Sequence, residues 1–72
     1  MTTQRLVTMA NQVASFFGSY TEPEAIEGTF GHLKAFWDPR MRREILAYAD
    51  EQQGAGLKKI VLEALRIHRR RS

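Results

Sequence analysis

The stretch FWDPRMRREI, residues 36–45, ends one predicted helix and begins the next. A residue that precedes proline is disfavoured in helical geometry, so Asp38 is expected at an N-cap position. Its carboxylate can accept hydrogen bonds from the free amides of the next turn, and its charge suits the positive end of a helix. Pro39 fits the first helical position, where the missing amide donor is not needed. The stretch therefore predicts a corner between two helices.

Apolar residues follow helical spacing on both sides of this corner. They recur at steps of three and four, which is the period of one face of a helix. These stripes comprise Leu6, Ala10, Val13, Phe17 and Tyr20 in the first segment; Ile26, Phe30, Leu33, Phe36 and Trp37 in the second; Met41, Ile45, Tyr48 and Ala49 in the third; and Leu57, Ile60, Val61, Ala64, Leu65 and His68 in the fourth. The pattern predicts an all-α fold, a compact small bundle of about four short helices that forms one domain over residues 1–72.

Turn and capping residues separate the predicted helices. Thr21 and Glu24 have the spacing of a capping box at the start of the second helix. The glycines of GAG, residues 54–56, break the chain between the third and fourth helices, because glycine readily adopts positive φ. Gly28 and Gly31 lie inside the second helix, where each costs about 1 kcal/mol relative to alanine. Either the helix frays there, or a neighbouring backbone approaches it closely, and we favour the close approach.

Composition excludes several kinds of chemistry. The chain has no cysteine, which rules out disulfides, a thiolate nucleophile and cysteine-based metal sites. His32 and His68 lie far apart in the sequence, and neither belongs to a recognised metal-binding motif. The sequence shows no signal peptide and no apolar run long enough to cross a bilayer. We therefore expect a cytoplasmic protein that has no membrane segment. We also expect that it is not an enzyme and that it carries no cofactor or metal of its own.

Positive charge is concentrated at the end of the chain. The net charge is +3, and the basic tail RIHRRRS, residues 66–72, alone carries four arginines and a histidine. Cations at the C-terminus of a helix are favoured by its dipole, so a solvated helix end accounts for them. The alternative is a small helical nucleic-acid-binding module that uses Arg66, Arg69, Arg70 and Arg71. Such phosphate binding would depend steeply on salt.

Three blocks of the sequence resemble the delta subunit of cytoplasmic NAD-dependent formate dehydrogenases. They are LVTMANQVASFF near the start, HLKAFWDPRMR in the middle and GAGLKKIVLEAL towards the end, and together they span about Leu6 to Leu65. The central block is the most specific of the three. The delta subunit of this family is the small all-helical member of molybdenum- or tungsten-containing complexes. The arginine-rich end of the chain lies beyond the resemblance.

The resemblance implies a non-catalytic subunit. In this family the large alpha subunit holds the bis-molybdopterin guanine dinucleotide and iron–sulfur clusters, and the beta and gamma subunits carry flavin and further clusters. The delta subunit contributes no redox group and is expected to bind the catalytic assembly, stabilising it or assisting cofactor insertion. A chaperone-like variant of this role would have basic residues contact phosphates of the cofactor.

The corner at residues 36–45 is also the predicted docking surface on the alpha subunit. Tryptophan and arginine are enriched at interface hot spots, and an indole at the very end of a helix is hard to bury in so small a domain. The predicted partner-binding residues are Met9, Phe16, His32, Phe36, Trp37, Asp38, Arg40 and Arg42. The competing interpretation is that Asp38 merely starts a helix, Phe36 and Met41 fill the core, and the arginines are solvated. The wide apolar stripes also permit self-association of the isolated chain.

Overall fold

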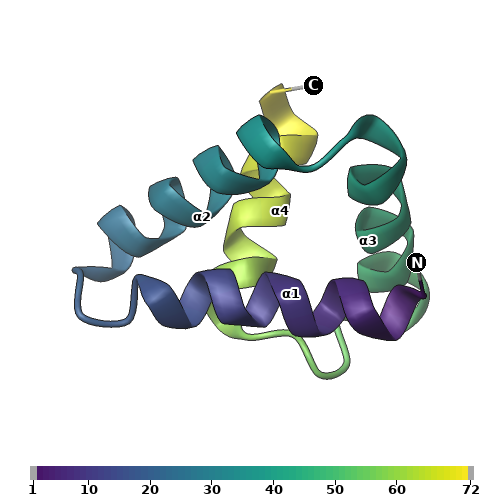
Figure 1. The fold of residues 1–72 in the computed structure, drawn as a ribbon, viewed down its shortest axis with the longest axis horizontal. Coiled ribbons are helices and arrows are strands. Elements are labelled where there is room, and N and C mark those ends of the chain that lie inside the picture. The colour runs from purple at the N-terminus through teal and green to yellow at the C-terminus, as the bar shows by residue number, and fades with distance from the viewer. Residues whose placement is uncertain (1, 72) are drawn as a thin grey trace.

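The structure is a computed structural model that describes residues 2–71, and these residues form four helices without a strand. The helices are α1 (Thr3–Phe16), α2 (Glu22–Phe36), α3 (Pro39–Glu51) and α4 (Lys59–Arg71) (Figure 1). The predicted all-α bundle is confirmed. Residues 66–71 of the basic tail belong to α4, whereas Met1 and Ser72 of the predicted domain lie outside the described residues.

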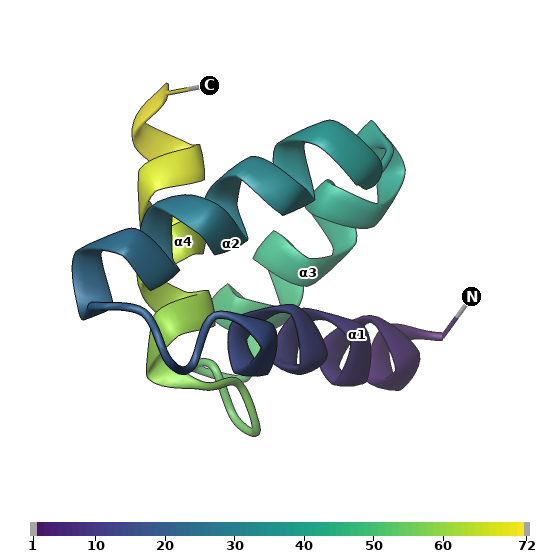
Figure 2. The same ribbon diagram turned by 60° about the vertical axis from the view of Figure 1, so that its left-hand side comes forward.

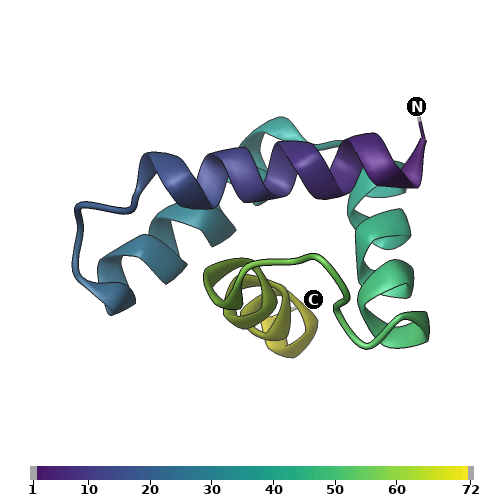
Figure 3. The same ribbon diagram turned by 90° about the horizontal axis from the view of Figure 1, so that it is seen from below.

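The four helices pack around one buried core. α1 and α2 diverge from the loop that joins them like the arms of a V, and α3 runs across the open side (Figure 1). α4 lies behind the V and forms its most extensive contacts with α2 (Figure 2). Seen from below, α1 and α4 occupy separate layers that α3 spans (Figure 3). No helix within residues 2–71 is both long enough and apolar enough to span a membrane.

Both predicted helix starts around α2 and α3 are confirmed. Thr21 Oγ1 accepts a hydrogen bond from the Glu24 amide at 3.4 Å, and the Thr21 amide donates to Glu24 Oε1 at 3.3 Å. Asp38 Oδ1 accepts from the Met41 amide at 2.9 Å, with Pro39 in the first turn of α3. These contacts satisfy amides that have no partner inside the helix, so they fix where the chain turns.

The loop between α3 and α4 is held against α1. Gly54 and Gly56 have φ of +74° and +81°, as the glycine break predicts. The side-chain amide of Asn11 donates to the Gly56 carbonyl at 2.8 Å, and its oxygen accepts from the Lys58 amide at 2.9 Å. One side chain of α1 therefore satisfies two backbone groups just before α4 begins.

The prediction that a neighbouring backbone approaches the glycines of α2 is wrong at both positions. A Cβ atom at Gly28 would lie 2.5 Å from the ring of Phe17, so a neighbour does approach closely, although it is a side chain and not backbone. A Cβ atom at Gly31 would meet nothing within 4 Å. The Phe17 ring thus packs on α2 near the point where α1 and α2 converge.

The core takes only part of the predicted apolar stripe of α1, and Leu6 and Ala10 of that stripe are fully buried. The buried core cluster comprises Leu6, Val7, Ala10, Ala14, Leu33, Trp37, Ile45, Leu57, Val61 and Leu65. Val13 and Phe17, both predicted in the inner stripe, are half-buried, and Tyr20 is 51% exposed beyond the end of α1. The buried stripe is therefore rotated towards Val7 and Ala14, which turns an apolar edge of α1 outwards.

Candidate functional site

An open groove of about 550 Å³ lies between the outward edges of α1 and α2. Its lining is mostly apolar, and among the described residues that form it none is acidic. The lining residues are Met9, Gln12, Val13, Phe16, Phe17, His32, Phe36 and Trp37. Five of the eight residues predicted to bind a partner thus meet in one groove, namely Met9, Phe16, His32, Phe36 and Trp37.

Exposed aromatic rings stand along this groove. The large hydrophobic side chains exposed within residues 2–71 are Phe16 at 73%, Phe36 at 74% and Tyr20 at 51%. Phe16 and Phe36 line the groove, and the Tyr20 ring centroid lies 5.4 Å from that of Phe17, which also lines it. Since each phenylalanine leaves most of its ring in water, covering the groove would release a favourable hydrophobic free energy that folding alone does not use.

The prediction of an exposed indole at Trp37 is wrong. The side chain is 4% exposed and belongs to the core cluster, so it forms the floor of the groove and not an anchor that projects from it. Trp37 is the C-cap of α2, with extended backbone at φ −94° and ψ 136°. Because it follows the last helical residue, helical spacing does not determine which side it faces. The interpretation that Phe36 fills the core is wrong as well.

Asp38 and Arg42 hold the corner together from within. Asp38 caps α3, and Arg42 Nη1 donates to the carbonyls of Leu33 at 3.4 Å and Lys34 at 3.2 Å, and also to the carbonyl of Trp37. The Lys34 and Trp37 carbonyls lie at the end of α2, where carbonyls lack partners inside the helix, and the Leu33 carbonyl also accepts from the Trp37 amide at 3.1 Å. The guanidinium of Arg42 is therefore committed to the domain's own backbone. Arg40, by contrast, is exposed at the start of α3.

Polar groups enter the groove from both of its helices. His32 is half-buried on α2, and its ring centroid lies 4.8 Å from that of Phe36. Gln12 is exposed on α1. Sequence reasoning missed Gln12, Val13 and Phe17 as groove residues, although Met9, Gln12, Val13 and Phe16 have the i, i+3, i+4, i+7 spacing of one helix face. That spacing was the available signal.

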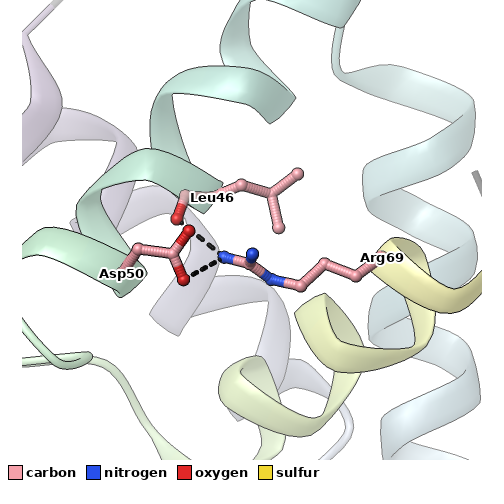
Figure 4. A network of polar contacts seen from close by, with 3 residues as sticks. All are labelled: Leu46, Asp50 and Arg69. Carbon is pink, nitrogen blue, oxygen red and sulfur yellow. Dashed lines mark hydrogen bonds and ion pairs between the residues drawn. The ribbon is translucent and has the colours of Figure 1, made fainter.

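Three of the four arginines of the basic tail contact the domain's own acidic residues. Arg69 Nη2 lies 2.6 Å from Asp50 Oδ1 and donates to the Leu46 carbonyl at 3.0 Å, which links α4 to α3 (Figure 4). Arg66 pairs with Glu63 and Arg71 with Glu27, each at 3.6 Å. Exposed pairs of this kind add little stability. They favour the interpretation of the tail as a solvated helix end over a phosphate-binding one.

His68 packs against α2 at the same end of α4. Its ring centroid lies 6.3 Å from that of Phe30, as expected for a packed histidine. Burial lowers the pKa of His68 below its ordinary value of 6.5, and the charges of Arg42 and Lys34 lower it further. Within residues 2–71, no three histidine, cysteine or acidic side chains come together as a metal site would require.

The lowered pKa of His68 predicts that the domain loses stability in mild acid. Near pH 6.5 the unfolded chain binds more protons at this residue than the folded chain does, so stability falls as pH drops below about 6.5. Urea unfolding followed by circular dichroism at about pH 7.5 and about pH 5.5 measures this change. The same change should be smaller in His68→Gln, because glutamine does not titrate. An equal decline in both proteins would contradict the assignment.

The fold and the groove together define a small helical domain whose exposed aromatic surface is suited to contact with another protein. A model of the family described as NADH-dependent formate dehydrogenase delta subunit FdsD matches residues 5–65. The chain belongs to this family of formate dehydrogenase delta subunits. No curated protein and no solved structure matches it. The match includes every residue that lines the groove, and it ends before Arg66.

Proposed function

We propose that this delta subunit docks on the catalytic alpha subunit of a NAD-dependent formate dehydrogenase through the groove between α1 and α2. Docking stabilises the alpha subunit or assists insertion of its molybdenum or tungsten cofactor. The observation that carries the proposal is the exposure of Phe16 and Phe36, at 73% and 74%, on the two helices that border the groove. Two such rings in a domain of 72 residues fit a hot spot that a larger protein covers.

The remaining chemistry of the complex belongs to other subunits in this proposal. The delta subunit brings no redox group, and the metal centre, iron–sulfur clusters and flavin reside on its partners in the cytoplasm. A lack of cysteine throughout the chain supports this division, because iron–sulfur clusters are held chiefly by cysteine thiolates. The contribution of the delta subunit is then the surface that it covers on the alpha subunit.

A pull-down with separated subunits tests the identity of the partner. The full delta chain, tagged at its C-terminus, is offered the alpha, beta and gamma subunits one at a time. It is expected to retain the alpha subunit on its own. Retention of beta or gamma while alpha passes through would overturn the proposal. Assay of the metal-loaded complex for the delta chain then distinguishes the two roles, since a stabilising subunit remains bound and an insertion factor leaves.

A further inference from the structure

We infer that the groove receives a short amphipathic α-helix of the alpha subunit, with apolar side chains at i, i+3 or i+4, and i+7 and a carboxylate directed at His32. This inference rests on the proposed function and adds the chemistry of the partner segment. It follows from three features of the groove, which are its backbone, its length and its charge.

The backbone around the groove offers no ladder of hydrogen bonds to an incoming chain. Residues 2–71 contain no strand whose edge could be extended, and the amides of α1 and α2 along the groove bond within those helices, which leaves open only the last carbonyls at the ends of the two helices. A segment that enters an apolar groove must therefore satisfy its own backbone, because leaving those groups unpaired would cost free energy. A helix meets this requirement, and an extended strand does not.

The dimensions of the groove match two turns of helix. Met9, Val13 and Phe16 follow i, i+4, i+7 spacing along α1, a span of seven residues that corresponds to about 10 Å at 1.5 Å per residue. Phe17 is the C-cap of α1 and packs over Gly28 of α2, so it closes the groove at the end of α1. The incoming helix would therefore lie along the V with its apolar face over the Trp37 floor.

The charge of the groove favours an acidic partner segment. None of the described lining residues is acidic, while His32 and Gln12 can both donate hydrogen bonds there. Arg40 is exposed at the corner where α2 ends. A carboxylate on the partner helix would gain a charge-assisted hydrogen bond from an imidazole N–H of His32. A basic partner segment would instead meet the like charge of Arg40.

Photo-crosslinking in the complex tests which segment of the alpha subunit covers the groove. A benzophenone amino acid is placed at Val13 or at Phe36 of the full delta chain, and at Arg70 as a control outside the groove. The groove positions are expected to crosslink to a single segment of the alpha subunit, at residues spaced by three or four. Crosslinks at alternate residues, to several separate segments, or to a second delta chain would overturn the inference. If the pull-down also fails to retain the alpha subunit, the proposed function falls with it; if the alpha subunit is retained, this inference alone falls.

A synthetic peptide of the crosslinked segment then tests its conformation. Trp37 is the single tryptophan of the chain and forms the groove floor, so its fluorescence in the full delta chain reports binding of a tryptophan-free peptide. Proline at the centre of the peptide is expected to weaken binding about 100-fold, since it breaks a helix interior, whereas alanine there leaves binding within a few-fold. Equal binding of the two peptides would overturn the inference.

The same assay tests the carboxylate. Replacing the acidic residue of the peptide by its amide is expected to weaken binding to the wild-type chain about tenfold. His32→Ala should remove most of that difference, and Arg70→Ala, outside the groove, provides the control. An unchanged difference in His32→Ala would show that the carboxylate lies elsewhere and would overturn this part of the inference.

Discussion

Trp37→Ala is expected to remove most of the stability of the domain. The indole is 4% exposed within the core cluster, and truncation of a buried aromatic side chain costs about 3–5 kcal/mol. A chain of 72 residues has roughly 4–11 kcal/mol in total, from about 0.05–0.15 kcal/mol per residue. Urea unfolding followed by far-UV circular dichroism measures the loss as a lower midpoint. If the total stability lies at the lower end of its range, the variant is expected to be partly unfolded even in water.

The neighbouring residue provides the matched control. Phe36 is 74% exposed, so Phe36→Ala is expected to change the free energy of unfolding by about 0.5 kcal/mol or less. The two substitutions remove aromatic rings from adjacent positions and differ chiefly in burial. If Trp37→Ala lowers stability by less than about 1 kcal/mol, the indole does not hold the core as the structure indicates. Loss of binding in Trp37→Ala would not identify a contact, because the groove loses its floor.

Local chemistry explains which parts of the fold could be predicted. The caps at Thr21 and Asp38 depend on residues within three positions of one another, so the sequence contains all the information that determines them. The positive φ of Gly54 and Gly56 is likewise a property of glycine in a helix break. Four helices separated at these points follow directly from such signals.

Tertiary packing explains what could not be predicted. α1 has apolar residues around about half its circumference, and the sequence does not say which part faces α4 and which borders α2. The core took Val7 and Ala14, which left Val13 and Phe16 to line the groove. Trp37 lies beyond the last helical residue of α2, so the direction that its indole faces depends on the turn into α3 and not on helical spacing. Five of the predicted residues thus meet in one groove, whereas the tryptophan is buried and not exposed as predicted.

Arg42 shows a similar limit of sequence reasoning. An arginine next to an aromatic pair is typical of an interface, and the sequence offers no sign that its guanidinium reaches back to the end of α2. The contact joins residues five to nine positions apart across a corner, so it depends on the angle between α2 and α3. Of the predicted arginines, Arg40 therefore remains in the proposed docking surface.

Phe36→Ala is expected to weaken binding to the alpha subunit by at least about 30-fold without unfolding the domain. A hot-spot side chain contributes about 2 kcal/mol or more, and each 1.4 kcal/mol is a factor of ten in the dissociation constant. Phe16→Ala should act similarly from the α1 side, since its ring is equally exposed in the groove. Biolayer interferometry with immobilised delta chain measures both constants, and unchanged urea midpoints establish that each variant is folded.

Two control variants separate the groove from the rest of the surface. Arg70→Ala lies on α4 beyond the family match and should bind within about two-fold of the wild-type chain, since surface changes away from an interface have little effect. Arg40→Ala removes an exposed charge at the corner, so it should chiefly slow association and reduce its salt dependence. If Phe36→Ala and Phe16→Ala bind as tightly as Arg70→Ala, the alpha subunit does not cover the groove. Because both phenylalanines contribute little to the fold itself, their loss reports on the partner alone.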